Sequence, residues 1–295
     1  MQGGDSGAGV IGVFGGSGLY EFAGLEDVRE TPVTTPFGAP SAPPLVGRFQ
    51  GRTVVFIPRH GRGHRFLPSE VNYRANVCAM KQLGVTQVIS VSAVGSMREE
   101  IGPGDFVLVD QFVDRTHRRA STFFGDGCVG HVGFADPVCP ELTDAVLAGA
   151  REASGSARTV HRGGAYLCIE GPQFSTRAES QIYRSFGVSV IGMTGATEAK
   201  LCREAELCFA LVALATDYDC WHPEEASVTV TAVLEVMRAN VAAAQETLRR
   251  ALPGLPTARR CACGTAARQA LLTSKDSISP ESRERLRGLY GRYFE

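Results

Sequence analysis

The sequence predicts an α/β fold in which helices cover the faces of a β-sheet. Short β-branched runs alternate with amphipathic stretches along the chain, which is the pattern of such folds. The chain has 295 residues, 44% of them hydrophobic, which is enough to bury a core in one large domain or two small ones. Six runs are apolar enough for central strands that are buried on both faces: residues 10–14, 53–58, 85–92, 106–110, 189–193 and 207–216.

Helices are predicted where capping and stop residues frame an amphipathic stretch. The stretch 69–83 begins with a serine that can cap a helix and ends before a glycine. Thr176 and Glu179 form a capping box for a helix that ends near Gly187. The clearest helix covers residues 229–252, where apolar residues recur near helical spacing and a proline follows as the stop.

The composition changes after residue 256, where a cysteine-containing turn leads into a charged segment. We expect residues 1–256 to form the main domain and residues 257–295 to form a C-terminal extension that packs on it, with a terminal helix over 280–295. The nine cysteines are dispersed along the chain, and only Cys261 and Cys263 are closely spaced. This spacing argues against a disulfide framework or a zinc site, so we expect reduced thiols.

Charge and hydropathy exclude several classes of protein. Thirty basic and 31 acidic residues give a formal net charge of -1, so no overall field attracts the chain to nucleic acid or to a membrane surface. A site that binds an anion must therefore come from a local cluster of donor residues. No run reaches the roughly 20 apolar residues of a membrane span, and the N-terminus lacks a signal-peptide pattern, so we expect a cytoplasmic protein.

Four predicted strand ends carry hydroxyl, guanidinium or amide donors. The donors include Ser17 in a glycine-rich loop, Arg59 and His60 in a basic loop, and Ser92 and Thr194 at two further strand ends. Each loop alone could be an ordinary turn or a solvated basic loop. Because α/β sheets bind ligands at the carboxyl ends of their strands, the recurrence favours a site for inorganic phosphate, to which guanidinium and imidazole groups donate hydrogen bonds.

Two carboxylates, Asp217 and Asp219, follow the last predicted strand beside aromatic residues. Mutual repulsion and partial burial raise the pKa of one such carboxyl group, which makes it a usable acid near neutral pH. The pair could then exchange protons with a heterocycle, or it could form a turn or cap a helix. A third carboxylate, Glu170, precedes a Gly-Pro dipeptide, and holding that turn is the alternative to a direct role.

These segments, in this order, resemble the methylthioadenosine phosphorylase branch of the trimeric purine nucleoside phosphorylases. The resemblance is carried by residues 11–19, 59–61, 72–73, 95–101, 110–112, 170–172 and 217–221. It implies a single α/β domain with a central mixed sheet flanked by helices. It also implies a homotrimer whose active sites lie near the subunit boundaries.

The resemblance assigns roles to residues of this sequence. For phosphate it implies the residues Ser17, Arg59, His60, Ser92, Ala93 and Thr194. For the purine and the ribose it implies Phe174, Ser175, Asp217, Asp219 and Met193. For the 5′ substituent it implies Val230, Val233 and His131, the histidine reaching in from a neighbouring subunit.

The reaction implied is phosphorolysis of S-methyl-5'-thioadenosine to adenine and 5-methylthioribose 1-phosphate. Phosphate is a co-substrate, and no metal or organic cofactor is implied. Asp217 would protonate N7 of the leaving purine and Asp219 would hold the exocyclic amine region, whereas the 6-oxopurine enzymes of the family typically place Asn there. Adenine is therefore favoured over hypoxanthine.

Several alternatives remain open from the sequence. An apolar 5′ pocket separates methylthio from chlorine or fluorine by only ~1–3 kcal/mol, so a phosphorylase of 5′-halogenated adenosines is one of them. Another is a methylthioinosine phosphorylase, because Thr194-Gly195 departs from the Thr-Val-Pro-Glu of the adenosine branch. A hydrolytic nucleosidase would not need the phosphate donors. A non-catalytic nucleoside-binding regulator belongs to a different class.

Overall fold

A computed structural model of the chain describes residues 9–16, 19, 23–222 and 230–295. Within that part, the strands are β1 (Val10–Gly15), β2 (Glu26–Glu30), β3 (Leu45–Phe49), β4 (Arg52–Pro58), β5 (Val85–Ser96), β6 (Phe106–Leu108), β7 (Gln111–Asp114), β8 (Val160–Arg162), β9 (Ala165–Cys168), β10 (Val190–Gly192) and β11 (Cys208–Asp217). The α-helices are α1 (Tyr73–Gln82), α2 (Pro140–Ser154), α3 (Arg177–Ser185), α4 (Gly195–Glu204), α5 (Val230–Gly254) and α6 (Pro280–Phe294). No helix in the described ranges is both long and apolar enough to cross a membrane.

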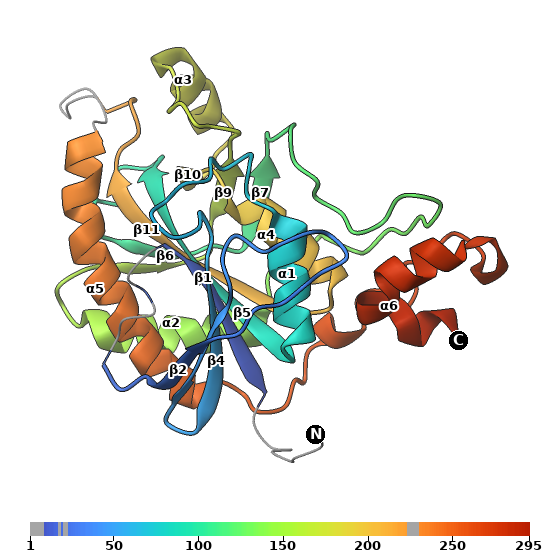
Figure 1. Cartoon of the computed structure of the whole chain (residues 1–295). Coiled ribbons are helices and arrows are strands. Elements are labelled where there is room, and N and C mark those ends of the chain that lie inside the picture. The colour runs from blue at the N-terminus through green and yellow to red at the C-terminus, as the bar shows by residue number, and fades with distance from the viewer. Residues whose placement is uncertain (1–8, 17–18, 20–22, 223–229) are drawn as a thin grey trace.

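The strands form one mixed sheet, which confirms the predicted fold class. The strands β1, β4, β5 and β11 run parallel at its centre, while β2, β3 and β4 form an antiparallel meander at one edge. The long strand β5 pairs with β1 and β11, and its last residues pair antiparallel with β10. The sheet therefore branches at β5, which lies at its centre (Figure 1).

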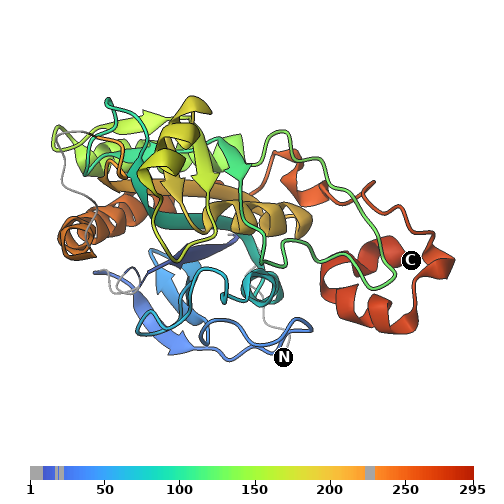
Figure 2. The same ribbon diagram turned by 90° about the horizontal axis from the view of Figure 1, so that it is seen from above.

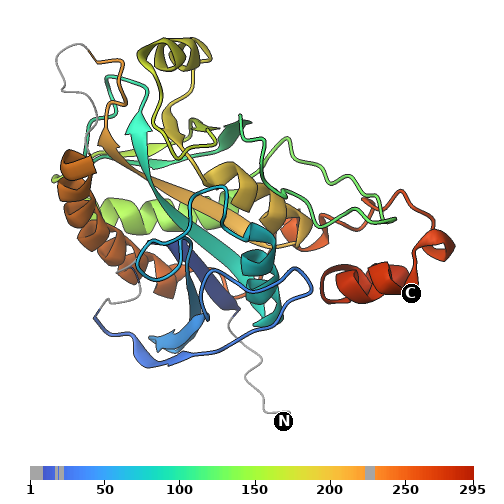
Figure 3. The same cartoon turned by 45° about the horizontal axis from the view of Figure 1, so that its top comes forward.

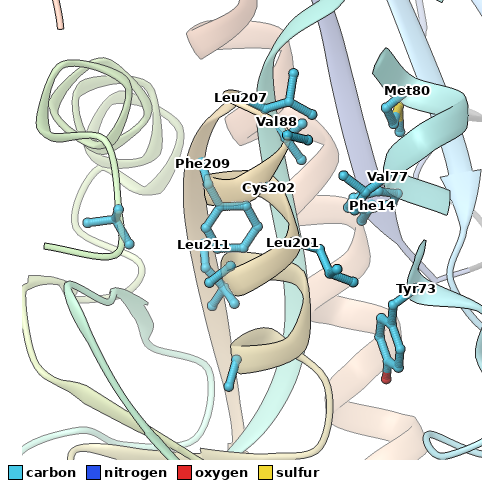
Figure 4. Close-up of a cluster of buried hydrophobic side chains, with 14 of the residues drawn as sticks. Phe14, Tyr73, Val77, Met80, Val88, Leu201, Cys202, Leu207, Phe209 and Leu211 are labelled. Atoms are coloured by element: carbon cyan, nitrogen blue, oxygen red, sulfur yellow. The ribbon is translucent and has the colours of Figure 1, made fainter. Parts of the chain in front are cut away.

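Helices cover both faces of the sheet (Figure 1). One buried cluster joins β5 and β11 to α1, α4 and α6, and a second joins the opposite face to α2 and α5. Figure 4 shows residues of the first cluster from α1 (Val77 and Met80), α4 (Leu201) and β11 (Phe209 and Leu211). Nine of the ten residues of β11 are buried, as expected for a central strand with helices on both faces.

Two helix boundaries differ from the sequence prediction. The helix predicted from residue 69 begins four residues later, because Asn72 rather than Ser69 is its cap: the Asn72 Oδ1 accepts a hydrogen bond of 3.1 Å from Ala75 N. The long helix α5 ends two residues after the predicted last residue, 252, and contains Pro253 in its last turn. The capping box is confirmed, since Thr176 and Glu179 exchange both hydrogen bonds at the start of α3.

The segment after residue 256 lies to one side of the sheet, next to the loop that follows β7 (Figures 1 and 2). Its main anchor is Glu206, a side chain that is almost fully buried. The carboxylate accepts hydrogen bonds from Ala267 N (3.0 Å) and from the Tyr293 hydroxyl (2.6 Å), and it pairs with Arg292. The ring of Tyr290 stacks on Phe124 of the loop with centroids 4.8 Å apart. These contacts join the segment to the core of the main domain.

Candidate active site

The loops that follow the parallel strands come together at one edge of the sheet. The carbonyl of Gly15, at the end of β1, accepts a hydrogen bond of 3.0 Å from Arg59 N, just after β4. The carboxyl ends of β5 and β11 lie at the same edge, on the side where α3 stands (Figure 3). The predicted phosphate residue Ser17 lies outside the described residues. Arg59 and Asp217 share this edge because β4 and β11 run parallel to β1 and β5. Thr194 follows β10, which pairs antiparallel with the end of β5.

Arg59 is buried here, and it is bound to other protein groups. Its Nε and Nη2 donate to the Glu198 carboxylate at 2.5 and 3.1 Å, and Nη2 also donates to Ser90 Oγ at 2.9 Å. Its Nη1 donates to Val91 O at 3.2 Å. Burial lowers the pKa of Arg59, but the charge of Glu198 and its hydrogen bond, with smaller contributions from neighbouring groups, outweigh burial and leave the pKa raised. Because a guanidinium has five N–H donors, one Nη1 donor remains for a ligand.

His60 follows Arg59 and has a fixed tautomer. Its Nδ1 lies 2.9 Å from the carbonyl of Phe66, which can only accept, so Nδ1 carries the proton. Burial, aided by the positive charge of Arg59, lowers the pKa of His60 to about 4. At neutral pH the free Nε2 is therefore an acceptor. The donor expected from the sequence analysis would appear at Nε2 only after protonation.

Ser92 and Thr194 meet at the hydroxyl of Tyr166. This hydroxyl lies 3.4 Å from Ser92 Oγ and accepts from Thr194 N at 3.4 Å. Thr194 also occupies the N-cap of α4, and its buried Oγ1 has no hydrogen-bond partner among the described residues. Next to Ser92, Ala93 is exposed although its strand is central in the sheet. An unpaired hydroxyl at a helix N-terminus beside an open strand position suits an anion.

Asp217 and Asp219 form a linked pair at the end of β11. Asp217 Oδ1 accepts from Asp219 N at 2.8 Å, and its Oδ2 accepts from Thr216 Oγ1 at 2.6 Å. Asp219 Oδ2 accepts from the buried Ser180 Oγ of α3 at 2.5 Å. Burial raises the pKa of both carboxyl groups, and for Asp217 the charge of Asp219 adds to this effect. Both groups therefore hold a proton more readily than an exposed aspartate.

The strand β5 carries Ser92 and Ala93 and passes next to Asp217 of β11. In the register of β5 with β11, Ser92 lies opposite Ala213 and Gly95 lies opposite Asp217. A Cβ on Gly95 would lie 3.0 Å from Asp217 Oδ1, so the strand passes directly behind the acid. Three residues of strand separate the two positions by about 10 Å. This distance accommodates one nucleoside between an anion and an acid.

The remaining purine and ribose residues lie around the acid pair. The Ser175 carbonyl accepts from Cys220 Sγ at 3.2 Å, which holds its loop next to Asp219. Phe174 in the same loop is 49% exposed, so its ring is free to contact a ligand. Met193 lies half-buried against Gly171, where a Cβ would come within 2.5 Å of the Met193 sulfur. The structure thus places the loop of Ser175 next to Asp219, and it places Met193 against the turn after β9.

Arg119 is a positioning residue that the sequence analysis missed. Its buried guanidinium donates to the Glu170 carboxylate at 3.0 Å and also to the Met193 carbonyl. Glu170 in turn accepts from the backbone N–H groups of His117 and Arg118 at 2.6 and 3.1 Å. Glu170 therefore holds the turn and the loop after β7, as its alternative role in the sequence predicts. The basic cluster 115–119 is the sequence signal for this contact.

The three residues assigned to the 5′ substituent are not brought to the acid pair by any described contact. Val230 and Val233 belong to the first turn of α5, and their side chains lie outside the described residues. His131 is exposed in the loop beside the C-terminal segment, where its N–H donates to Ala270 O at 2.8 Å. These assignments therefore stay predictions.

Four cysteines converge away from this site. The sulfur atoms of Cys139, Cys208, Cys261 and Cys263 all lie within 4.8 Å of one another. The sequence spacing of the cysteines argued against a zinc site, but the fold brings four of them together. Sequence spacing could not show the cluster, because its members come from three segments that only the fold brings together.

Comparisons with known proteins agree with this geometry. The family model for the phosphorylase superfamily matches residues 10–253 of this chain. The S-methyl-5'-thioadenosine phosphorylase of Geobacter sulfurreducens is 58% identical over 285 residues, which are 96% of this chain and 99% of the relative. The enzyme of that name from Koribacter versatilis is 53% identical and covers 96% of each chain.

Solved structures give the same result. The crystal structure of a methylthioadenosine phosphorylase from an antarctic soil metagenomic library has a TM-score of 0.91 and 44% identity, and the match covers 97% of this chain and 99% of that chain. A mutant adenosine/methylthioadenosine phosphorylase of Schistosoma mansoni in complex with methylthioadenosine has a TM-score of 0.76 and 39% identity, over 83% of this chain and 92% of that chain. The chain therefore belongs to the S-methyl-5'-thioadenosine phosphorylase family of the phosphorylase superfamily.

Proposed function

We propose that this chain cleaves S-methyl-5'-thioadenosine with inorganic phosphate, releasing adenine and 5-methylthioribose 1-phosphate. The observation that carries the proposal is the placement of an anion site and a buried acid about 10 Å apart along β5. The family membership supports it, since the named relatives are phosphorylases of this nucleoside. We therefore assign the chain to purine and methionine salvage.

The phosphate would lie between Thr194 and the loop after β4. The unpaired Thr194 hydroxyl, the N-terminus of α4 and the remaining Nη1 donor of Arg59 supply hydrogen bonds to its oxygens. His60 Nε2 accepts a hydrogen bond from the P–OH group of hydrogen phosphate, because its Nδ1 donates to a carbonyl. Ser17, Ser92 and Ala93 complete the proposed site by family resemblance.

The purine would lie at the acid pair. As the bond between C1′ and N9 breaks and phosphate oxygen bonds to C1′, protonated Asp217 gives its proton to N7, so adenine leaves neutral. The proton of hydrogen phosphate leaves with the sugar phosphate product, and exchange with solvent returns a proton to Asp217. Asp219 accepts a hydrogen bond from the 6-amino group and is oriented by Ser180. Phe174 and Ser175 contact the base, and Met193 lies under the ribose.

The proposed preference for adenine rests on Asp217 and Asp219, and Gly195 does not oppose it. A Cβ on Gly195 would lie 2.6 Å from Leu211 Cδ1 of β11. Packing of α4 on the sheet therefore explains this glycine without reference to the base. The apolar group at the 5′ position would meet Val230 and Val233.

We further propose that the chain works as a cytoplasmic homotrimer without a cofactor in the reaction. His131 lies on the outer loop beside the C-terminal segment. That position supports its proposed role in the site of a neighbouring subunit. Nucleic acid and membranes are not expected partners, because the formal net charge is only -1.

A product assay tests the proposed function. S-methyl-5'-thioadenosine, methylthioinosine, adenosine and a 5′-chloro analogue are each incubated with and without phosphate, and base release is followed by chromatography. We expect the first substrate to react with the highest kcat/KM and only with phosphate. Full release without phosphate would identify a hydrolase, and binding without turnover of any substrate would identify a regulator. A higher kcat/KM for the 5′-chloro compound or for methylthioinosine would reassign the substrate.

A further inference from the structure

The cluster of four cysteines lies where the C-terminal segment meets the main domain. Cys139 is the N-cap residue of α2, and Cys208 is the first residue of β11. Cys261 and Cys263 come from the turn after α5. The four sulfur atoms lie within 4.8 Å of one another, and those of Cys208 and Cys261 are 3.4 Å apart. Cys139, Cys208 and Cys263 are buried.

We propose that Cys139, Cys208, Cys261 and Cys263 bind one zinc ion in tetrahedral geometry. A tetrahedral site with Zn–S bonds of about 2.3 Å separates its sulfur atoms by about 3.8 Å. The Cys208–Cys261 separation of 3.4 Å and the upper limit of 4.8 Å for all pairs lie on either side of that value. An iron–sulfur cluster would hold the sulfurs further apart, because inorganic atoms stand between the ligands. The donor set of four thiolates suits zinc best among common divalent cations.

The surroundings can accommodate the charge of such a site. Four thiolates around one zinc ion carry a net charge of about −2. Arg203 lies with its Nη1 4.0 Å from Cys263 Sγ, which places a positive charge at the cluster. Cys139 lies at the N-terminus of the 15-residue helix α2, where the helix dipole favours negative charge. Both contacts stabilise thiolates.

An ion can reach the cluster from solvent. A hollow of about 530 Å³ has Cys261, Cys263, Arg203, Asp136 and Glu141 among its lining residues. The hollow contains none of the residues assigned to the active site. The zinc ion would have all four positions filled by protein, as in structural sites, so it would take no part in the proposed reaction. Its effect would be to fix the C-terminal segment to α2 and β11.

Metal content tests the proposal directly. The full chain is purified under reducing conditions without an affinity metal, and zinc and iron are measured by mass spectrometry. We expect one zinc per chain in the parent, close to none in Cys263→Ala, and one in the matched control Cys78→Ala, whose buried cysteine lies in α1. A parent protein that lacks zinc overturns the proposal even where Cys263→Ala fails to fold. Iron in place of zinc also overturns it.

Two further measurements separate zinc binding from oxidation. Cobalt added to chelator-treated protein should give the charge-transfer and d–d absorption of tetrahedral thiolate ligation, and zinc should raise the thermal unfolding temperature of the treated protein. After removal of zinc, the intact mass measured without reductant should equal that of the chain with all its cysteines reduced. In protein that never held zinc, a mass lower by the four hydrogens that two disulfides remove would instead identify the cluster as paired disulfides.

Discussion

Replacing Asp217 by asparagine removes the acidic proton and keeps the hydrogen bonds that hold the side chain in the fold. In the parent, Asp217 Oδ1 accepts from Asp219 N, and Oδ2 accepts from the hydroxyl of Thr216, which also lies 3.1 Å from Val94 O. In the variant, the amide oxygen can still accept from Asp219 N. The Thr216 hydroxyl can turn its proton to Val94 O and accept from the new amide. The variant should therefore fold with little loss of stability.

The catalytic cost should be large because the variant has no proton to give to N7. Loss of a general acid reduces the rate by about 100- to 10,000-fold, or about 3–5 kcal/mol of transition-state stabilisation. We expect that loss in kcat/KM for S-methyl-5'-thioadenosine. The 6-oxo analogue should lose less, because an asparagine amide can donate to a 6-oxo group. The ratio of the two kcat/KM values should shift towards methylthioinosine.

The pH profile gives a second test of the same residue. Burial raises the pKa of Asp217, so the neutral acid persists to higher pH than in an exposed aspartate. As pH rises through that raised pKa, the acid loses its proton and kcat/KM of the parent should fall. Asp217→Asn should lack this fall, while Asp27→Asn, an exposed position on the edge strand β2, should keep it. An unchanged substrate ratio together with an unchanged profile would refute the assignment of Asp217.

Three further perturbations follow from the geometry. Arg59→Ala should raise the phosphate KM and, because it leaves the buried Glu198 carboxylate unpaired, lower the free energy of urea unfolding by about 3–5 kcal/mol; a normal phosphate KM would remove Arg59 from the site. Ser180→Ala removes a hydrogen bond to the Asp219 carboxylate, which raises the pKa of Asp219. The low-pH limb of the pH–rate profile, where Asp219 becomes protonated, should therefore shift to higher pH, and an identical profile would contradict the coupling. His60 has a depressed pKa, so folding loses stability as pH falls from about 6.5 to about 4; His60→Gln should weaken that loss in thermal unfolding, and an unaltered pH dependence would argue against burial of a neutral ring.

Much of the sheet could be predicted from the sequence, and its edges could not. The apolar run of β11 and the capping box at α3 are strong local signals, and both were confirmed. The strand β2 consists of exposed residues with only one apolar side chain, so it has no hydrophobic pattern to detect. The strands β8 and β9 have three and four residues, too few to establish a period. The helix α2 is capped by Cys139, which is not a usual capping residue.

The candidate site was predictable in its residue types and less so in their partners. The strand-end positions of Arg59 and Asp217 could be found because parallel strands bring their carboxyl ends together. The ion pair of Arg59 with Glu198 joins residues 139 positions apart, and the sequence holds no local signal for it. The same holds for the contact of Arg119 with Glu170. Only the tertiary structure decides which donors are occupied and which remain for a ligand.

The strand β5 fixes the distance between Ser92 and Asp217. Because Gly95 lies opposite Asp217, the distance from Ser92 to the acid is set by the pairing of β5 with β11 and not by a loop. Insertion of one residue between Ser92 and Gly95 would turn the following side chains to the opposite face of the sheet. Changes in the loop after β4 can therefore move Arg59 and His60, while Ser92 keeps its place relative to Asp217.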